Sequence, residues 1–192
     1  SSVYQHFTAT AARFGDRPFL HIPASAAPYA GKAIDFTYQS AQDAINDRMS
    51  AYAKAGLGPR RRVALMLDNR ADFFLHWLAL TGLGVSIVPL NAEATLLYTS
   101  GSTGKPKGCL LSNTYFTVMG AWYKDLGGLC AMTDGAERLL TPLPLVHMNA
   151  LATSTMAMIL TGGCIIQLDR FHPKTWWQSL AETKATIVHY LG

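Results

Sequence analysis

Short apolar runs alternate with segments of helical periodicity along this chain. Three such runs cover residues 63–67 (VALML), 85–90 (VSIVPL) and 164–168 (CIIQL). Between the first two, apolar residues recur every three or four positions, as in residues 73–78. Strands that are apolar throughout are typical of a parallel sheet whose two faces are covered by helices. The sequence therefore predicts an α/β fold with layered, largely parallel sheets.

The remaining helices and strands are expected to follow the same alternation. Ser40 and Asn113 are the expected N-caps of two helices, because a hydroxyl or amide side chain accepts hydrogen bonds from the free amides of the first turn. The second of these helices carries Tyr115, Met119 and Trp122 on its apolar side. Further helices are expected at residues 3–13, 150–160 and 175–183, and further strands at residues 18–22, 139–144 and 185–190.

The run YTSGSTGKPKG at residues 98–108 differs in composition from the rest of the chain. Glycine lets successive backbone amides converge on one point, hydroxyls donate hydrogen bonds to oxyanions, and lysine supplies positive charge. The run contains no acidic residue that would repel an anion. It therefore predicts a polyphosphate-binding loop. The residues expected to contact the phosphates are Thr99, Ser100, Gly101, Ser102, Thr103, Gly104, Lys105 and Lys107.

Two other interpretations of this run fit the sequence less well. A Walker A loop has four residues between its glycines and a serine or threonine after its lysine. Here two residues separate Gly101 from Gly104, and a proline follows the lysine. A flexible linker would join polar segments, whereas residues 96–98 and 109–111 on either side of the run are apolar or aromatic.

YTSGSTGKPKG resembles the phosphate-binding signature of the adenylate-forming enzymes. This AMP-binding superfamily includes acyl-CoA synthetases, luciferases and the adenylation domains of peptide synthetases. Residues 56–91, residues 142–150 (PLPLVHMNA) and residues 162–192 are similar to other segments of the family's N-terminal domain. The segments VHMNA and RFHPKTWW are most similar to carnitine/crotonobetaine-CoA ligases.

The resemblance implies a two-step reaction that uses ATP, Mg²⁺ and CoA. A carboxylate attacks the α-phosphorus of ATP to give an acyl-adenylate and pyrophosphate, and the thiol of CoA then displaces AMP. By matching position, Thr99 contacts ATP and Mg²⁺, residues 100–107 line the triphosphate, and Lys107 is catalytic. His147 is a second catalytic residue at the gate of the acyl pocket, or else a structural histidine at a strand end. Asn149 orients it or caps the next helix.

Two departures from the family pattern concern the extent of the chain. Only residues 91–95 (NAEAT) separate VPLN from the phosphate-binding run, where the family has a much longer segment. We expect a segment to be omitted near residues 92–95, because losing a strand and helix would leave sheet edges unpaired; a natural deletion is the alternative. The adenine and ribose motifs and the C-terminal lid domain of the family are also absent from residues 1–192. The chain is therefore expected to be an incomplete N-terminal AMP-binding domain that is not competent alone.

Three functions are compatible with these features. The preferred one is an acyl-CoA synthetase that acts on a small-molecule carboxylic acid and CoA. The alternatives are a non-catalytic ATP- or phosphate-binding module and a peptide-synthetase-type adenylation domain. The latter usually presents an aspartate just after the segment that corresponds to residues 142–150, and this sequence has none there. The family is often dimeric, so a homodimer is one expected assembly.

Composition bears on the remaining partners and on location. A net charge of +4 is too small to predict a nucleic-acid partner, and residues 60–62 (RRR) are interpreted as a solvated turn. Proline and glycine interrupt the apolar residues 139–168, so no stable membrane insertion is expected. Three widely spaced cysteines and a polar N-terminus without a secretory signal favour reduced thiols and a cytoplasmic location.

Overall fold

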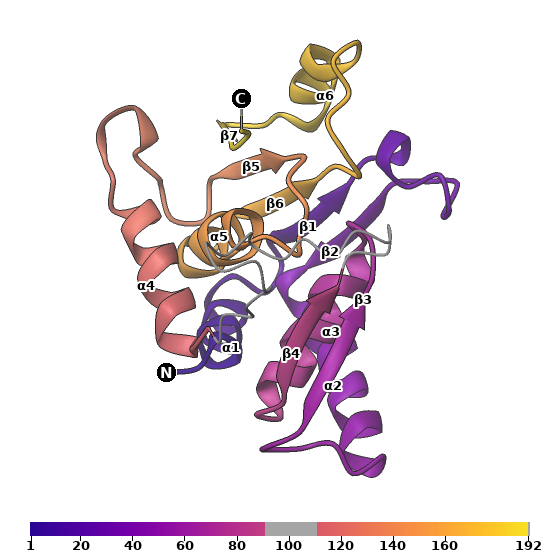
Figure 1. Cartoon of the computed structure of the whole chain (residues 1–192). Coiled ribbons are helices and arrows are strands. Elements are labelled where there is room, and N and C mark those ends of the chain that lie inside the picture. Colours follow the sequence, from indigo (N-terminus) through magenta and orange to yellow (C-terminus); the bar gives the residue numbers. More distant parts are fainter. Residues whose placement is uncertain (91–110, 192) are drawn as a thin grey trace, which may run out of the picture.

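Two sheets separated by helices make up the computed structural model, which describes residues 1–90 and 111–191 (Figure 1). The larger sheet contains β1 (Pro18–Ile22), β2 (Ile34–Thr37), β5 (Arg138–Thr141), β6 (Cys164–Gln167) and β7 (Ile187–Val188). Its strand order is β2-β1-β6-β5-β7, and every neighbouring pair is parallel except β1 with β2. The prediction of an α/β fold with largely parallel sheets is therefore confirmed.

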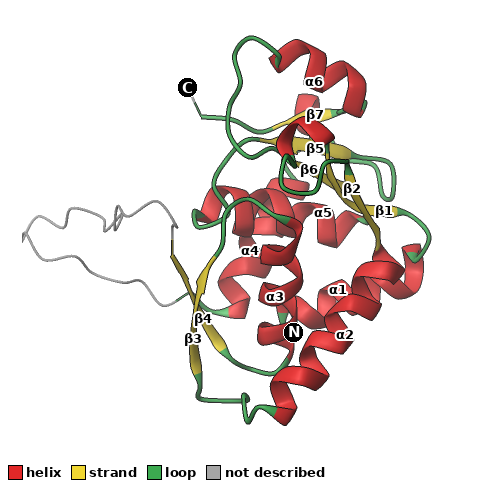
Figure 2. Cartoon of the chain, turned by 90° about the vertical axis from the view of Figure 1, so that its right-hand side faces the viewer, coloured by secondary structure: helices red, strands yellow, loops and turns green. Residues whose placement is uncertain are grey.

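The second sheet contains β3 (Arg62–Met66) and β4 (Ser86–Leu90), which lie parallel. Both strands begin and end within one residue of their predicted positions. They are joined through α3 (Ala71–Gly82), because a parallel pair requires a crossover connection. Most residues of α3 are buried, since this helix lies between the two sheets (Figure 2).

The other helices surround the larger sheet. Figures 1 and 2 show α1, α3 and α5 on one side of this sheet and α6 on the other. The bounds are α1 (Val3–Phe14), α2 (Tyr38–Lys54), α4 (Asn113–Lys124), α5 (Met156–Thr161) and α6 (Trp176–Thr183), with the 3-10 helices η1 (Ala24–Ala26) and η2 (Gly128–Cys130) and the π-helix η3 (Asn149–Thr155). Residues 139–168 thus fold into β5, η3, α5 and β6, and within the described ranges no helix has the length and apolarity that a membrane span needs.

The two predicted N-caps are wrong by one to three residues. α2 begins after Thr37, whose Oγ1 accepts a hydrogen bond from the amide of Ser40 at 3.1 Å, while Ser40 Oγ accepts one from the amide of Thr37 at 2.9 Å. Ser40 is therefore the reciprocal half of a capping box. α4 begins after Ser112, and Asn113 Oδ1 instead accepts a hydrogen bond from the amide of Val3 at 3.0 Å. At each helix start two capping residues stand close together, and the earlier one is the cap.

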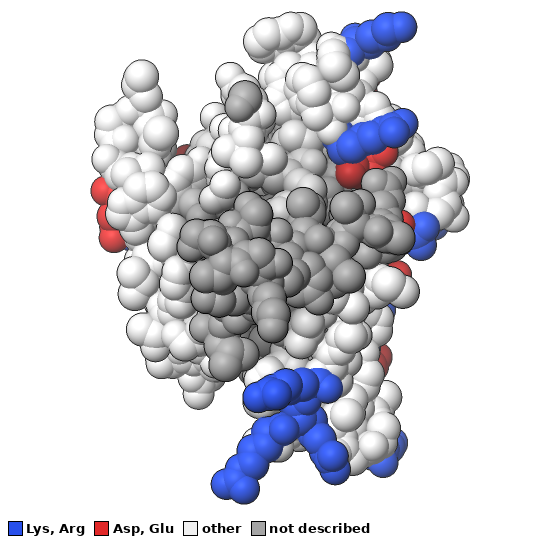
Figure 3. Space-filling model, in the orientation of Figure 1, with Lys and Arg blue, Asp and Glu red and all other residues white. Residues whose placement is uncertain are grey.

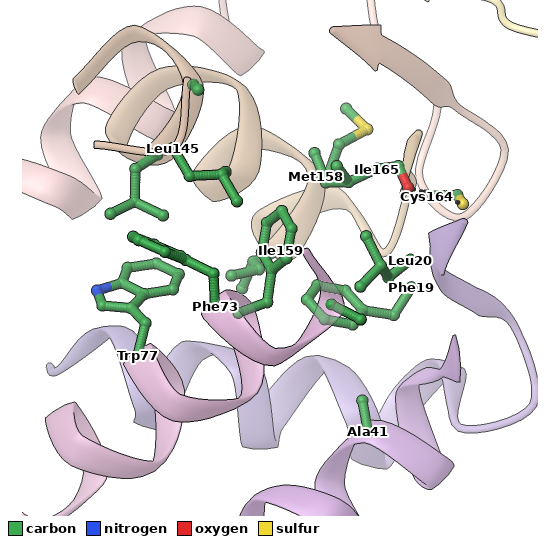
Figure 4. Close-up of a cluster of buried hydrophobic side chains, with 14 of the residues drawn as sticks. Phe19, Leu20, Ala41, Phe73, Trp77, Leu145, Met158, Ile159, Cys164 and Ile165 are labelled. Atoms are coloured by element: carbon green, nitrogen blue, oxygen red, sulfur yellow. Dashed lines mark hydrogen bonds between the residues drawn. The ribbon is translucent and has the colours of Figure 1, made fainter. Parts of the chain in front are cut away.

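The core lies where α3 and α5 face the larger sheet (Figure 4). Phe73 and Trp77 of α3 point toward Leu145 and Ile159, and all four side chains are at most 1% exposed. Burying each such side chain contributes about 1.5–3 kcal/mol. Because Leu145 is anchored in this way, the core also fixes the segment that follows β5.

Candidate functional site

The predicted phosphate-binding run lies outside the described residues. The structure describes the segments on either side of it, where β4 ends at Leu90 and α4 begins at Asn113. The roles given to residues of the run, including the catalytic role of Lys107 and the metal contact of Thr99, therefore stay predictions. The same holds for Ser100, Gly101, Ser102, Thr103, Gly104 and Lys105.

His147 lies in the turn between β5 and η3, beyond the carboxyl end of β5. Its amide donates a hydrogen bond to the carbonyl oxygen of Pro144 at 3.0 Å, and its own carbonyl oxygen accepts one from the amide of Leu151 at 3.2 Å. His147 itself is exposed. In α/β folds, ligands bind beyond the carboxyl ends of the strands. The backbone thus holds His147 in a place that a ligand can reach.

The segment after His147 departs from the α-helix predicted over residues 150–160. Residues 149–155 form a π-helix, and the α-helical form begins only at α5. Thr155 Oγ1 donates a hydrogen bond to the carbonyl oxygen of Ala150, five residues earlier, at 2.8 Å. Asn149 makes no capping hydrogen bond, so the interpretation of this residue as a cap is wrong. Single π-helical turns occur frequently at functional sites, and this one directly follows the candidate histidine.

His189 contacts the π-helix from a distant part of the chain. Its Nδ1 is hydrogen-bonded to Ser154 Oγ, and its ring centroid lies 5.5 Å from that of Tyr123. Desolvation by burial lowers the pKa of His189. A neutral, half-buried imidazole that bonds to a helix residue stabilises the position of η3, which is a structural role.

A cavity of about 620 Å³ opens beyond the carboxyl ends of β3, β5 and β6. Residues 67–70 follow β3, residues 144–146 follow β5, and Asp169 and Arg170 follow β6. Tyr29, from the loop after η1, completes the wall. The size lies within the range of small-molecule sites, about 300–1,000 Å³. This cavity and His147 are therefore built on adjoining segments after β5.

Asn69 ties the walls of this cavity together. Its Nδ2 donates hydrogen bonds to the carbonyl oxygens of Leu143 at 3.2 Å, Leu168 at 3.0 Å and Asp169 at 3.2 Å. Its Oδ1 accepts one from the amide of Leu145 at 2.9 Å. The Asn69 side chain is buried, so these hydrogen bonds take the place of hydrogen bonds to water that the backbone groups lose on burial. One amide therefore fixes the ends of three strands relative to each other.

Two arginines and two aspartates give the cavity its charge. Arg70 lies over the ring of Tyr29, with Cζ 4.0 Å from the ring centroid, a cation–π contact. Burial raises the pKa of Tyr29, and the positive charge of Arg70 opposes that shift. Arg170 Nε lies 3.8 Å from Asp169 Oδ2. Asp68 is exposed at the rim.

This cavity is not predicted from the sequence. Its residues come from four segments far apart in the chain, and although residues 144–146 and Arg170 belong to family-like segments, no sequence motif joins the four. A usable signal exists, because Asn69-Arg70 and Asp169-Arg170 each lie within four residues of the end of an apolar strand. Polar residues at the carboxyl ends of strands are typical of ligand sites in α/β folds, although the sequence does not show that the ends of β3 and β6, which belong to different sheets, meet.

The described ranges contain no group of three His, Cys, Asp or Glu side chains that could hold a metal ion. Cys130 and Cys164 are free thiols, as expected for reduced cysteines. Figure 3 shows basic side chains gathered at the lower tip of the molecule, where the turn between α2 and β3 lies in Figure 1. Arg60 and Arg61 in this turn and Arg62 at the start of β3 are exposed, which agrees with a solvated turn.

Comparisons with known sequences agree with this architecture. The profile of a family described as AMP-binding enzyme matches residues 7–96 and 92–191. Sulfoacetate–CoA ligase of Cupriavidus necator is 35% identical over 96 residues, which are 50% of this chain and 18% of that protein. Crotonobetaine/carnitine–CoA ligase of Citrobacter koseri is 20% identical over 237 aligned residues, with 82% of this chain and 45% of that protein covered. The chain thus spans less than half the length of these relatives.

A solved structure supports the same fold. O-succinylbenzoate coenzyme A synthetase of Bacillus subtilis, in complex with AMP, superposes with a TM-score of 0.80 and 18% sequence identity. The superposition covers 95% of this chain and 60% of the other. At this identity the likeness establishes the arrangement of sheets and helices.

Proposed function

This chain belongs to the AMP-binding enzyme family, and on that premise we propose that it is the N-terminal part of an ATP-dependent acid–thiol ligase. The observation that carries the proposal is the match of the family profile to residues 7–96 and to residues 92–191, the second of which includes YTSGSTGKPKG. The named ligases of Cupriavidus necator and Citrobacter koseri support CoA as the acceptor.

In the proposed reaction, a carboxylate oxygen of the acid attacks the α-phosphorus of ATP, and the bond from that phosphorus to the bridging oxygen of pyrophosphate breaks. The sulfur of CoA then attacks the acyl carbon and AMP leaves. Lys107 and the hydroxyls and amides of residues 99–104 would stabilise the charge that builds on the departing pyrophosphate. Mg²⁺, when bound with ATP through Thr99, would neutralise further phosphate charge.

ATP–pyrophosphate exchange with a panel of carboxylic acids tests the proposal on the complete ligase, with the 192-residue chain assayed in parallel. We expect acid-dependent exchange by the complete ligase and, after CoA is added, an acyl-CoA product. ATP binding without exchange for any acid would instead support a phosphate-binding module. Exchange with amino acids and no transfer to CoA would favour a peptide-synthetase-type adenylation domain.

Replacement of His147 by alanine is expected to lower the rate of acyl-CoA formation by the complete ligase about tenfold, because a misplaced thiol or acyl group loses its reactive orientation. Pyrophosphate exchange should change much less, since the proposed role is at the acyl and thiol channel. Rates of both half-reactions measure this split. His6→Ala on α1 is the matched control. Unchanged rates for His147→Ala would remove it from the site.

We also propose that a segment is omitted between residues 91 and 96. The two profile matches overlap at residues 92–96, and the alignment with the Citrobacter koseri ligase runs over more residues than this chain contains. Among the described strands, β4 pairs with β3 alone, and the amide of Ser86 donates to Arg61 at 3.0 Å. The next residue, Ile87, therefore presents its backbone groups at the open edge. A coding sequence that is continuous from Asn91 to Leu96 would contradict this proposal.

A further inference from the structure

We propose that His189 is a positioning residue that holds His147 in place through the π-helix η3. The role of His147 in acyl transfer rests on the proposed function, whereas the link between the two histidines rests on hydrogen bonds and packing among the described residues. The link has three parts, which are the anchoring of His189, its bond to η3, and the bond from η3 to the backbone of His147.

His189, the residue after β7, is held by two other elements of the fold. Its amide donates a hydrogen bond to the carbonyl oxygen of Leu140 in β5 at 3.0 Å. Its ring packs against Tyr123 of α4, a side chain that is only 9% exposed. Packing against a buried ring restricts the rotamers that an imidazole can adopt. Nδ1 of His189 is therefore a fixed point to which another group can be bonded.

Ser154 is the residue of η3 that is bonded to this point. The hydroxyls of Thr155 and Thr161 donate to carbonyl oxygens of their own helical segments, at 2.8 and 2.9 Å. Ser154 Oγ is instead bonded to Nδ1 of His189, and Ser154 is fully buried. A buried hydroxyl that loses its partner costs free energy, and π-helical turns are rare. We therefore expect the bond between Ser154 and His189 to hold this turn in its π-helical form.

The first residues of η3 fix the backbone of His147. The amide of Leu151 donates a hydrogen bond to the carbonyl oxygen of His147 at 3.2 Å, and the amide of His147 donates one to Pro144 at 3.0 Å. Leu151 is buried, whereas His147 is exposed. An exposed side chain has little packing of its own, so the place of His147 depends on these two backbone bonds. A movement of η3 would shift His147, and a displacement of about 1 Å can lower a rate about 100-fold.

Amide hydrogen exchange of the 192-residue chain, followed by NMR, tests this link without an assay of activity. The amide of Leu151 reports its bond to His147. His189→Phe keeps an aromatic ring but removes Nδ1, and Ser154→Ala removes the hydroxyl. Each should speed exchange at Leu151 about tenfold, the change expected for one lost hydrogen bond. The double variant should exchange no faster than either single one, because both remove the same bond. His189→Asn should exchange like the parent, since asparagine places a hydrogen-bonding atom near the position of Nδ1.

His76→Phe is the matched control. His76 on α3 is also a partly buried histidine whose Nδ1 is bonded to a hydroxyl, that of Tyr52, at 2.6 Å. Burial lowers the pKa of both His76 and His189. The bond of His76 joins α3 to α2, so its loss should lower stability without a selective change at Leu151. Exchange at Ile166 in the central strand β6 separates the two effects, because a general loss of stability speeds exchange there as well.

The proposal is overturned if His189→Phe and Ser154→Ala leave exchange at Leu151 unchanged, or speed it only as much as at Ile166. It is also overturned if His76→Phe produces the same selective effect. Ser154→Ala, which removes one oxygen atom, keeps the test valid if His189→Phe unfolds the chain.

In the complete ligase, His189→Phe should slow acyl-CoA formation about tenfold, as expected for His147→Ala, with a much smaller change in pyrophosphate exchange. Acyl-CoA formation at the parent rate by His189→Phe, with Leu151 selectively loosened, would refute the positioning role. Selective loosening of Leu151 in a ligase whose parent forms no acyl-CoA from any acid would retain the link between the two histidines and refute the ligase function.

Discussion

Lys107→Ala is expected to slow ATP–pyrophosphate exchange by the complete ligase about 100-fold or more, the cost of removing one group that stabilises charge in a transition state. Negative charge develops on the bridging oxygen as pyrophosphate leaves, and an ammonium group stabilises that charge more than it stabilises bound ATP. The loss should therefore appear mainly in the rate at saturating ATP, with a smaller change in the apparent affinity for ATP.

Arg61→Ala provides the matched control for this prediction. It removes the same unit of charge, but Arg61 is exposed in the turn between α2 and β3. Screened surface charge at a distance has little effect on chemistry at a site, so exchange should stay within about twofold of the parent rate. If Lys107→Ala and Arg61→Ala slow exchange equally, the run YTSGSTGKPKG does not hold the triphosphate.

The elements predicted best from sequence are those whose local pattern of apolar residues is enough to identify them. β1 is found at the predicted residues 18–22, and the apolar periodicity of residues 73–78 identified α3. These segments are buried on most sides, so their apolar residues identify them even when the neighbouring elements are not known. The π-helical form of residues 149–155 could not be predicted in this way, because nothing in the local pattern distinguishes it from an α-helix.

The buried face of α4 shows the limit of periodicity most clearly. Tyr115, Met119 and Trp122 have the spacing of one helix face, yet Trp122 is 55% exposed. The buried residues of this helix are Gly120 and Tyr123. A glycine has no apolar side chain, so a helix face that is buried through a glycine is not visible in the pattern of apolar residues. The cavity around Arg70 escaped prediction for a related reason, since its residues converge only after folding.

Gly120→Ala is expected to lower the free energy of unfolding of the 192-residue chain by about 2–3 kcal/mol, the upper range for overpacking. A Cβ at this position would lie 2.5 Å from Met156 Cβ, 2.9 Å from the carbonyl carbon of Met156 and 3.2 Å from the amide nitrogen of Ala157. Two of these three atoms are backbone, so α5 would have to move away from α4. Urea unfolding followed by circular dichroism measures the change.

The helix propensity of alanine acts against the predicted loss of stability. In an exposed helix, alanine stabilises relative to glycine by about 1 kcal/mol, so the crowding at α5 must exceed that gain before the variant is destabilised. Gly58→Ala is the control, because a Cβ there meets nothing within 4 Å and the backbone does not need a positive φ; its stability should change by less than about 0.5 kcal/mol. A Gly120→Ala chain as stable as the parent would mean that α4 and α5 do not pack this closely. Since α4 follows the predicted phosphate-binding run and η3–α5 follows His147, that result would also separate the two parts of the proposed active site.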